Sequence, residues 1–121
     1  PGVIPAGTTS AETICLTDLM PTIAAAAGVP LPADAAPDGF DVLPALKGEK
    51  RDGPVRGPVV HQSARGQLAV RRGEWKLIAA PPKGAAGKGT EPATAELYDL
   101  RADPGETKNA LGDRPDVAKE L

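Results

Sequence analysis

The sequence predicts an α+β fold, in which a small four-stranded antiparallel sheet is packed by a helix at the C-terminus. Two observations favour it. Four short runs rich in β-branched or other apolar residues lie in the second half of the chain, separated by turn-forming residues. The residues from Pro115 onward have the early proline and the composition of a short helix. The predicted strands are residues 58–64, 66–72, 74–80 and 95–100.

The composition provides little material for an independent core. The chain of 121 residues has the length of one domain, but Leu, Ile, Val and Phe together form only about a fifth of it. It contains 14 Gly and 14 Pro, and its only aromatic residues are Phe40, Trp75 and Tyr98. Two interpretations fit: a loosely packed small domain, or a fragment of a larger fold that supplied the rest of the core. We favour the fragment.

Charge and hydropathy argue against several classes of partner. The formal net charge is −2 and the basic residues are spread along the chain, so we expect no nucleic-acid-binding surface. No apolar run approaches the ~20 residues that a membrane-spanning helix needs. The single cysteine, Cys15, cannot form an internal disulfide and has no neighbour at metal-ligand spacing.

The first half of the chain is expected to hold one strand and one helix. Residues 11–16 form a short apolar run that fits a strand buried on both faces. Residues 17–28 show the spacing of an amphipathic helix. Asp18 or the threonine before it caps its start, Pro21 lies in its first turn, and Gly28 ends it. The rest of this half is a connector rich in Pro and Gly, with one short helical turn.

Within the sheet, Trp75 is interpreted as a packing residue. Strand alternation places Trp75 and Leu77 on one face, under the terminal helix, and Lys76 on the other. We expect Arg71 and Arg72 to line the edge of the sheet and to pair with acids such as Glu74 or Asp99.

Candidate catalytic residues are few. Cys15 lies between Ile14 and Leu16 and is interpreted as a small buried hydrophobe, because nothing beside it would stabilise a thiolate. His61 and Ser63 would share one face of a strand, but a catalytic pair also needs an acid that orients the histidine. A satisfied polar strand face is the preferred interpretation.

Metal and phosphate sites are not indicated. The aspartates within residues 34–41 lack the spacing and the closing Glu of a calcium loop. The Gly/Pro-rich connection at residues 81–95 has neither a following helix nor a Lys-Ser/Thr pair, so it is interpreted as a flexible loop. Lys83 and Lys88 in this loop are candidates for contact with an anionic ligand.

Several motifs follow one another along the chain: Asp18-Leu19 with Pro21-Thr22; Asp38-Gly39; Ala69-Val70-Arg71 with Gly73 and Trp75-Lys76-Leu77; and Leu97-Tyr98-Asp99-Leu100 with Asp103-Pro104, Glu106 and Asn109. In this order they resemble the C-terminal part of the formylglycine-dependent sulfatases, the arylsulfatase family of the alkaline-phosphatase-like superfamily. The resemblance implies that residues 1–57 are the tail end of the large α/β sulfatase domain, a strand-helix remnant. It implies that residues 58–121 are the C-terminal subdomain.

The resemblance also implies an intact parent that is a sulfuric ester hydrolase, carries formylglycine and calcium, and is periplasmic or secreted. Its catalytic motif, Cys/Ser-x-Pro/Ala-x-Arg, is not met at Cys15, because Thr17 and Leu19 stand at the Pro/Ala and Arg places. We therefore expect no catalytic residue, metal ligand or cofactor in this chain.

The chain is thus expected to be an inactive structural subdomain that borders the active site, with the missing N-terminal catalytic domain as its partner. The residues that would face the sulfate ester at the rim of that site are His61, Lys83 and Lys88. The alternative is a free-standing binding or self-association module, which would form homo-oligomers through an exposed strand at residues 11–16.

Overall fold

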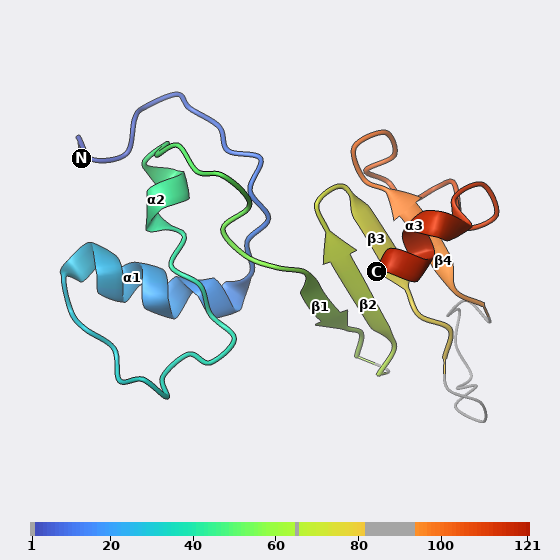
Figure 1. Ribbon diagram of the computed structural model, residues 1–121, viewed down its shortest axis with the longest axis horizontal. Coiled ribbons are helices and arrows are strands. Elements are labelled where there is room, and N and C mark those ends of the chain that lie inside the picture. Colours follow the sequence, from blue (N-terminus) through green and yellow to red (C-terminus); the bar gives the residue numbers. More distant parts are fainter. Residues whose placement is uncertain (1, 65, 82–93) are drawn as a thin grey trace. The chain divides into compact units, whose positions relative to one another are not determined.

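The computed structural model describes residues 2–64, 66–81 and 94–121 (Figure 1). The chain divides into two compact units, Pro1–Gly57 and Pro58–Leu121. The first unit contains helices and irregular segments, and the second contains the sheet (Figure 1). None of the helices in the described residues has the length and hydropathy of a membrane-spanning segment.

The first unit is built around helix α1, Leu19–Ala27. A turn of 3-10 helix, η1, Leu16–Asp18, leads into it. Its end is set by Gly28, whose φ of 68° is the left-handed conformation that glycine adopts without strain. The amide of Val29 then donates to the carbonyl of Ala24 over 2.9 Å. The helix predicted over residues 17–28 is therefore present, and its C-terminal signal is confirmed. A second short helix, α2, Leu43–Leu46, forms in the connector.

The strand predicted at residues 11–16 is wrong. Residues 11–15 are irregular and Leu16 begins the 3-10 turn. A strand needs a neighbour that accepts and donates its backbone hydrogen bonds, and no described residue of the first unit lies in a strand. Self-association through a strand at these residues therefore loses its basis.

The second unit confirms the predicted four-stranded antiparallel sheet. Its strands are β1, Val59–Gln62; β2, Leu68–Arg72; β3, Trp75–Ile78; and β4, Glu96–Asp99. They pair in the order β1-β2-β3-β4, each antiparallel to the next. In the hairpin between β2 and β3, Arg72 pairs with Trp75, which leaves Gly73 and Glu74 as the turn. The φ of Gly73 is 60°. Two-residue hairpin turns of types I′ and II′ both require a positive φ at the first central residue, which glycine adopts without strain.

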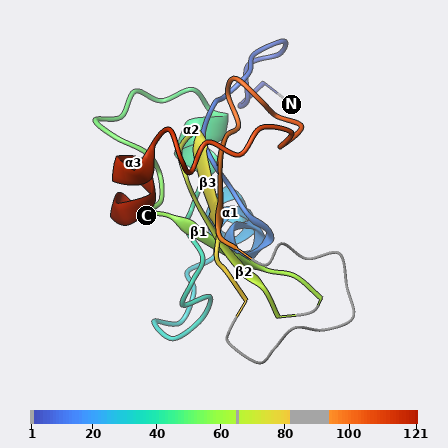
Figure 2. The same cartoon turned by 90° about the vertical axis from the view of Figure 1, so that its right-hand side faces the viewer.

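The two faces of the sheet differ in composition. Trp75 lies opposite Asp99 and Leu77 opposite Leu97, so the apolar side chains of β3 and β4 share one face. Leu97 is fully buried there. Helix α3, Pro115–Glu120, is only six residues long and lies on one side of the sheet (Figures 1 and 2). Before it, the Arg114 guanidinium lies 5.3 Å from the centre of the Trp75 ring.

The two edges of the sheet also differ. At the outer edge of β4, the Leu97 amide donates to Asn109 Oδ1 over 3.1 Å, and the Ala110 amide donates to the Leu97 carbonyl over 2.7 Å. At the outer edge of β1, no backbone hydrogen bond from elsewhere in the described residues is found. The sheet therefore has one occupied edge and one open edge in the described part of the chain.

Candidate functional site

A groove of about 360 Å³ lies on the second unit, over the face of the sheet opposite Trp75. Its polar lining consists mainly of His61, Ser63, Gln67, Arg71, Lys76 and Glu106. Ala69, Ile78 and Leu100 contribute apolar walls. The groove is open to solvent, because strands β1 to β3 form its floor without any covering element among the described residues that line it.

Strand register brings the groove residues together. His61 of β1 pairs with Ala69 of β2, and Arg71, two residues further along β2, pairs with Lys76 of β3. Alternation places all four on one face. Two cations therefore stand opposite one another on neighbouring strands, an arrangement that destabilises a sheet unless an acid or an anion lies nearby.

Each cation in the groove has an oxygen partner within the unit. Lys76 Nζ lies 2.7 Å from Glu106 Oε1, and both side chains are partly buried. Arg71 Nε donates to the Gly73 carbonyl over 3.2 Å. Because a carbonyl carries no net charge, the positive charge of Arg71 is not neutralised by this contact. The groove consequently carries a net positive contribution from Arg71.

Arg72 pairs with an acid as expected, but neither of the two acids given as examples is the partner of Arg71 or Arg72. Arg72 pairs with Glu120 of α3 over 3.2 Å, and Arg71 contacts Gly73, so neither meets Glu74 or Asp99. Asp99 is engaged in local contacts and does not pair with an arginine of β2. Its Oδ1 accepts hydrogen bonds from the amides of Arg101 and Ala102, which fix the turn after β4.

Among the residues named from sequence, His61 lies exposed in the groove. Ser63 lies beyond the end of β1, and its Oγ accepts the amide of Gln67 over 3.1 Å. No hydrogen bond joins His61 to a carboxylate in the described residues, so the groove lacks the oriented histidine of a nucleophilic triad there. Lys83 and Lys88 lie outside the described residues.

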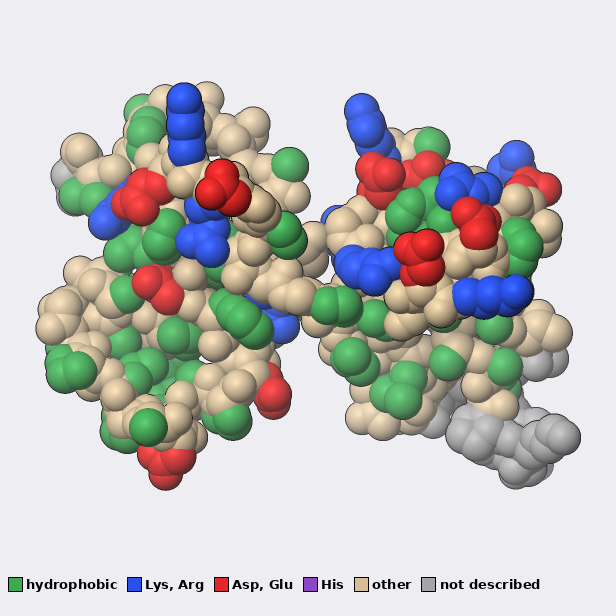
Figure 3. Space-filling view, in the orientation of Figure 1, with side chains coloured by type: hydrophobic (Ala, Val, Ile, Leu, Met, Phe, Trp, Pro, Cys, Tyr) green, Lys and Arg blue, Asp and Glu red, His purple; other side chains and the backbone are tan. Residues whose placement is uncertain are grey.

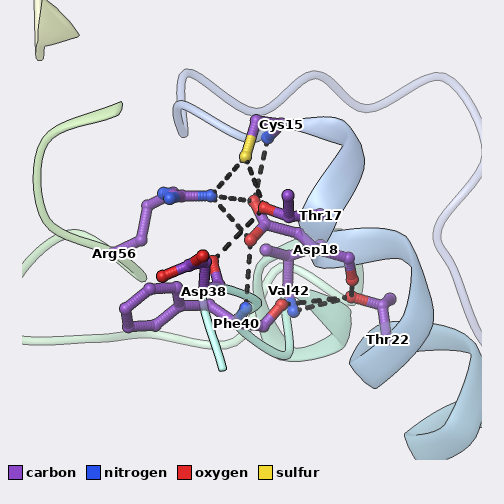
Figure 4. Close-up of polar contacts among 8 residues, drawn as sticks. All are labelled: Cys15, Thr17, Asp18, Thr22, Asp38, Phe40, Val42 and Arg56. Carbon is purple, nitrogen blue, oxygen red and sulfur yellow. Dashed lines mark hydrogen bonds and ion pairs between the residues drawn. The ribbon is translucent and has the colours of Figure 1, made fainter. Parts of the chain in front are cut away.

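The first unit contains a buried ion pair that sequence reasoning missed (Figure 4). Arg56 Nη1 lies 2.6 Å from Asp18 Oδ1 and 2.7 Å from Oδ2. The side chains of Asp18 and Arg56 are 1% and 8% exposed. Asp18 also accepts the amide of Cys15 over 2.8 Å and the amide of Phe40 over 3.0 Å. Its carboxylate thus joins three segments of the first unit.

These contacts hold Asp18 in its charged form. Burial alone would raise the pKa of the carboxyl, but the hydrogen bonds from Cys15, Arg56 and Phe40 and the charge of Arg56 together lower the pKa below its ordinary value. For Arg56, burial opposes the charge, yet the hydrogen bond and the charge of Asp18 raise the pKa of the guanidinium. The pair therefore stays ionised at neutral pH.

Two expectations for this region change. Asp18 does stand at the N-cap of α1, but it makes no side-chain capping bond to the first turn. Cys15 is not an apolar packing residue: its Sγ lies 2.6 Å from Arg56 Nη1 and 2.9 Å from Thr17 Oγ1 (Figure 4). One signal in the sequence could have indicated the cluster, namely that Asp18 and Thr22 are four residues apart on one helix face. Nothing local points to Arg56, 38 residues away from Asp18.

Thr22 completes the polar side of α1. Its Oγ1 donates to the Asp18 carbonyl over 2.6 Å and accepts the amide of Val42 over 3.0 Å. Between these contacts Gly39 passes so close to the helix start that an added Cβ would lie 2.6 Å from the Thr17 carbonyl oxygen. The cluster has a structural role, because its polar groups are buried and hydrogen-bond to one another. It holds the segment of residues 38–42 against the start of α1. The described residues contain no group of three or more His, Cys, Asp or Glu side chains that could hold a metal ion.

Comparisons with known proteins found relatives among the sulfatases. No family model matches the chain. It is 38% identical over 112 residues to an N-acetylgalactosamine-6-O-sulfatase of Bacteroides thetaiotaomicron, covering 86% of this chain and 21% of that protein. It is 38% identical over 127 residues to human arylsulfatase A, covering 93% of this chain and 25% of the relative. A solved structure in complex with its substrate, D-glucosamine-2-N,6-O-disulfate, superposes with a TM-score of 0.74 at 28% identity, over 98% of this chain and 24% of the other.

The matches cover most of this chain but only a minor part of each relative. The chain spans about a fifth to a quarter of the length of the sulfatases that it matches. From its sequence, its fold and these comparisons, the chain belongs to the sulfatase family, as a fragment homologous to one portion of the sulfatase chain.

Proposed function

We propose that this chain is the C-terminal part of a sulfatase that hydrolyses sulfate esters, and that it contributes structure and part of the rim of the active site. The observation that carries this proposal is the homology of nearly the whole chain to a fifth to a quarter of two sulfatases. The first unit is then the tail end of the large α/β domain and the second unit the C-terminal subdomain. The division of the chain between Gly57 and Pro58 supports this assignment.

In the subdomain, we propose that α3 packs on the apolar face of the sheet. Val117 of α3 is buried, Glu120 pairs with Arg72 of β2, and Arg114 lies over the Trp75 ring. This arrangement leaves the opposite face, with its groove, for contact with the rest of the enzyme and its substrate. The helix therefore has a structural role and the groove the functional one.

The groove suits an anionic substrate. A sulfate ester retains one negative charge, and Arg71 supplies a positive charge that no acid in the described groove neutralises. His61 stands one strand away and offers a ring nitrogen to a sulfate or hydroxyl oxygen. We place His61 at the rim, together with Lys83 and Lys88 of the connection between β3 and β4.

The catalytic centre belongs to the part of the enzyme that this chain does not contain. Formylglycine and calcium are proposed for that part, because Thr17 and Leu19 depart from the family's motif at Cys15. Cys15 itself is held by Arg56 and Thr17 inside the first unit. The chain alone is therefore proposed to be inactive, and its partner is the catalytic domain.

The test uses two proteins. The purified chain is assayed for sulfate release from aryl and amino-sugar sulfate esters, and we expect none. A hybrid of the Bacteroides thetaiotaomicron N-acetylgalactosamine-6-O-sulfatase, in which this chain replaces the matching segment, should release sulfate. In that hybrid, His61→Ala should lower kcat/KM, whereas Val60→Ala, an exposed neighbour on the other face of β1, should not. Sulfate release by the pure chain would contradict the proposal.

A further inference from the structure

Helix α1 is inverted with respect to a normal surface helix. In a helix that lies on its own core, the apolar stripe is buried and the polar side faces water. Here the polar Asp18, at the N-cap, and Thr22 within the helix are 1% and 7% exposed. The apolar Leu16, in the preceding turn η1, and Ile23 within the helix are 84% and 64% exposed. The unit therefore turns the polar side of this helix inward and leaves its apolar side uncovered.

The uncovered residues form one continuous stripe. Leu16, Leu19, Ile23 and Ala27 follow one another at intervals of three or four residues, the spacing that aligns side chains along one helix face, and Met20 lies beside Leu19, four residues after Leu16 and three before Ile23. Leu19 and Met20 are 49% and 53% exposed. Figure 3 shows hydrophobic side chains gathered over the part of the first unit where α1 lies. Such a patch marks an interaction surface or a site of aggregation.

The polar side of α1 explains why the stripe faces outward. Asp18 is fixed by Arg56 and by the Phe40 amide, and Thr22 is fixed by the Val42 amide. Rotating the helix to bury the stripe would break these contacts and leave two charges unpaired in the interior, which costs several kcal/mol per ion. The contacts of Asp18 and Thr22 therefore fix the orientation of α1, and they keep the apolar stripe exposed.

We infer that the stripe Leu16, Leu19, Met20, Ile23 and Ala27 is a docking surface for the portion of the sulfatase fold that this chain does not contain. This inference rests on the proposed function. The relatives have about four to five times the length of the matched segment, since the chain covers 21% and 25% of them. A stripe of Leu, Ile and Met without charges calls for an apolar occupant. The additional length of the relatives supplies such an occupant in our assignment.

The first measurement uses the chain alone. Leu16→Glu combined with Ile23→Glu places two charges in the stripe, and because both positions are exposed, the midpoint of thermal unfolding should not change. Ala33→Glu, which adds a charge to an exposed loop of the same unit, is the matched control. A lowered midpoint for the double variant alone would show that the stripe is already covered within the chain, and would overturn the inference.

The second measurement uses the hybrid enzyme described above. There the double variant should lower the unfolding midpoint by about 5 °C or more, because it buries charges without partners, whereas Ala33→Glu should leave it unchanged. An unchanged midpoint for the double variant, or a hybrid that does not fold with the native chain, would overturn the inference. So would a dimer of the isolated chain that the double variant dissociates in sedimentation, because the occupant would then be a second copy.

The two proposals fail in different ways. A folded hybrid that is destabilised by the double variant but releases no sulfate contradicts the proposed function and leaves the docking surface in place. An active hybrid whose kcat/KM falls with His61→Ala, but whose unfolding midpoint does not change in the double variant, supports the proposed function and contradicts the docking surface. Thermal unfolding thus reports on the stripe independently of activity.

Discussion

Arg56 Nη1 lies 2.6 Å from Asp18 Oδ1, in a pair whose side chains are almost completely withdrawn from solvent. The two residues are separated by 38 positions in the chain. Their contact closes the first unit by joining its helix start to its last residues. The first unit buries few large apolar side chains, so the hydrophobic effect contributes little to its stability. It therefore depends on the contact between Asp18 and Arg56.

Asp18→Ala should therefore strongly destabilise the first unit. It leaves the Arg56 charge without a counter-charge and the amides of Cys15 and Phe40 without an acceptor, and the expected loss is about 3–5 kcal/mol. Urea unfolding measures it, with Glu74→Ala as control, since Glu74 and Arg101 form an exposed pair at 3.8 Å. That control should cost about 1 kcal/mol or less. Similar losses for the two variants would show that the buried pair contributes no more than a surface pair.

The same pair predicts an acid transition. The pKa of Asp18 is lowered in the folded state, so its stabilising contribution is present above the unfolded value of about 4 and is lost as the pH falls through the lowered folded value. In Asp18→Asn this part of the pH dependence should disappear. The measurement is the unfolding midpoint between about pH 5 and 2 for both proteins, and parallel curves would contradict the prediction.

Gly39 should not tolerate a side chain. Its Cβ would lie 2.6 Å from the Thr17 carbonyl oxygen and 3.0 Å from Pro21 Cγ, so Gly39→Ala must push the loop off the start of α1. We expect a loss of about 1–3 kcal/mol in thermal or urea unfolding. Gly53→Ala serves as the control, because its Cβ would meet nothing within 4 Å. Equal stability of the two variants would show that the close approach is not required.

Tyr98 predicts a loss of stability in base. Its hydroxyl donates to Glu96 over 2.9 Å, and burial, followed by the hydrogen bond and charge of Glu96, raises its pKa to about 12. A raised pKa means that the neutral phenol stabilises the fold. This contribution is complete below the unfolded value of about 10 and is lost as the pH rises through 12. Tyr98→Phe should flatten the decline in unfolding midpoint above pH 10; an unchanged decline would assign it to other groups.

Asn109 should be required for the outer edge of the sheet. Its Oδ1 accepts the amides of Leu97 and Leu111 over 3.1 and 2.9 Å. Asn109→Ala leaves the amide of the fully buried Leu97 without a partner, at a cost of about 1–3 kcal/mol. Asn109→Asp keeps an acceptor oxygen and should lose less. Hydrogen exchange of the Leu97 amide measures the effect directly, and unchanged protection in Asn109→Ala would contradict it.

The elements that could be predicted from the sequence are those with local causes. The four strands follow from alternation and turn residues, and the end of α1 follows from Gly28, whose left-handed conformation is found as expected. The strand predicted at residues 11–16 is wrong because a strand depends on a neighbour, and the described residues of the first unit supply none. The resemblance to sulfatases, by contrast, rests on motif order and is confirmed by the relatives.

The site was less accessible to sequence reasoning. His61, Arg71 and Lys76 are brought to one groove by strand register, which alternation predicts only once the pairing is known. The Asp18–Arg56 pair arises from a long-range closure for which no spacing rule exists. Asp18 occupies the N-cap position that aspartate favours, but its carboxylate contacts Arg56 and the Phe40 amide and makes no capping bond to the first turn of α1.

The difference between the two edges of the sheet limits how copies of this chain can associate through strand pairing. In the described residues the edge at β4 is occupied by Asn109 and Ala110, and the edge at β1 is open. Two copies that meet through β1 would form one continuous sheet whose two ends are both occupied. Edge-to-edge association of the described sheet therefore closes at a pair around a twofold axis, whereas a fibre would require each copy to offer two open edges.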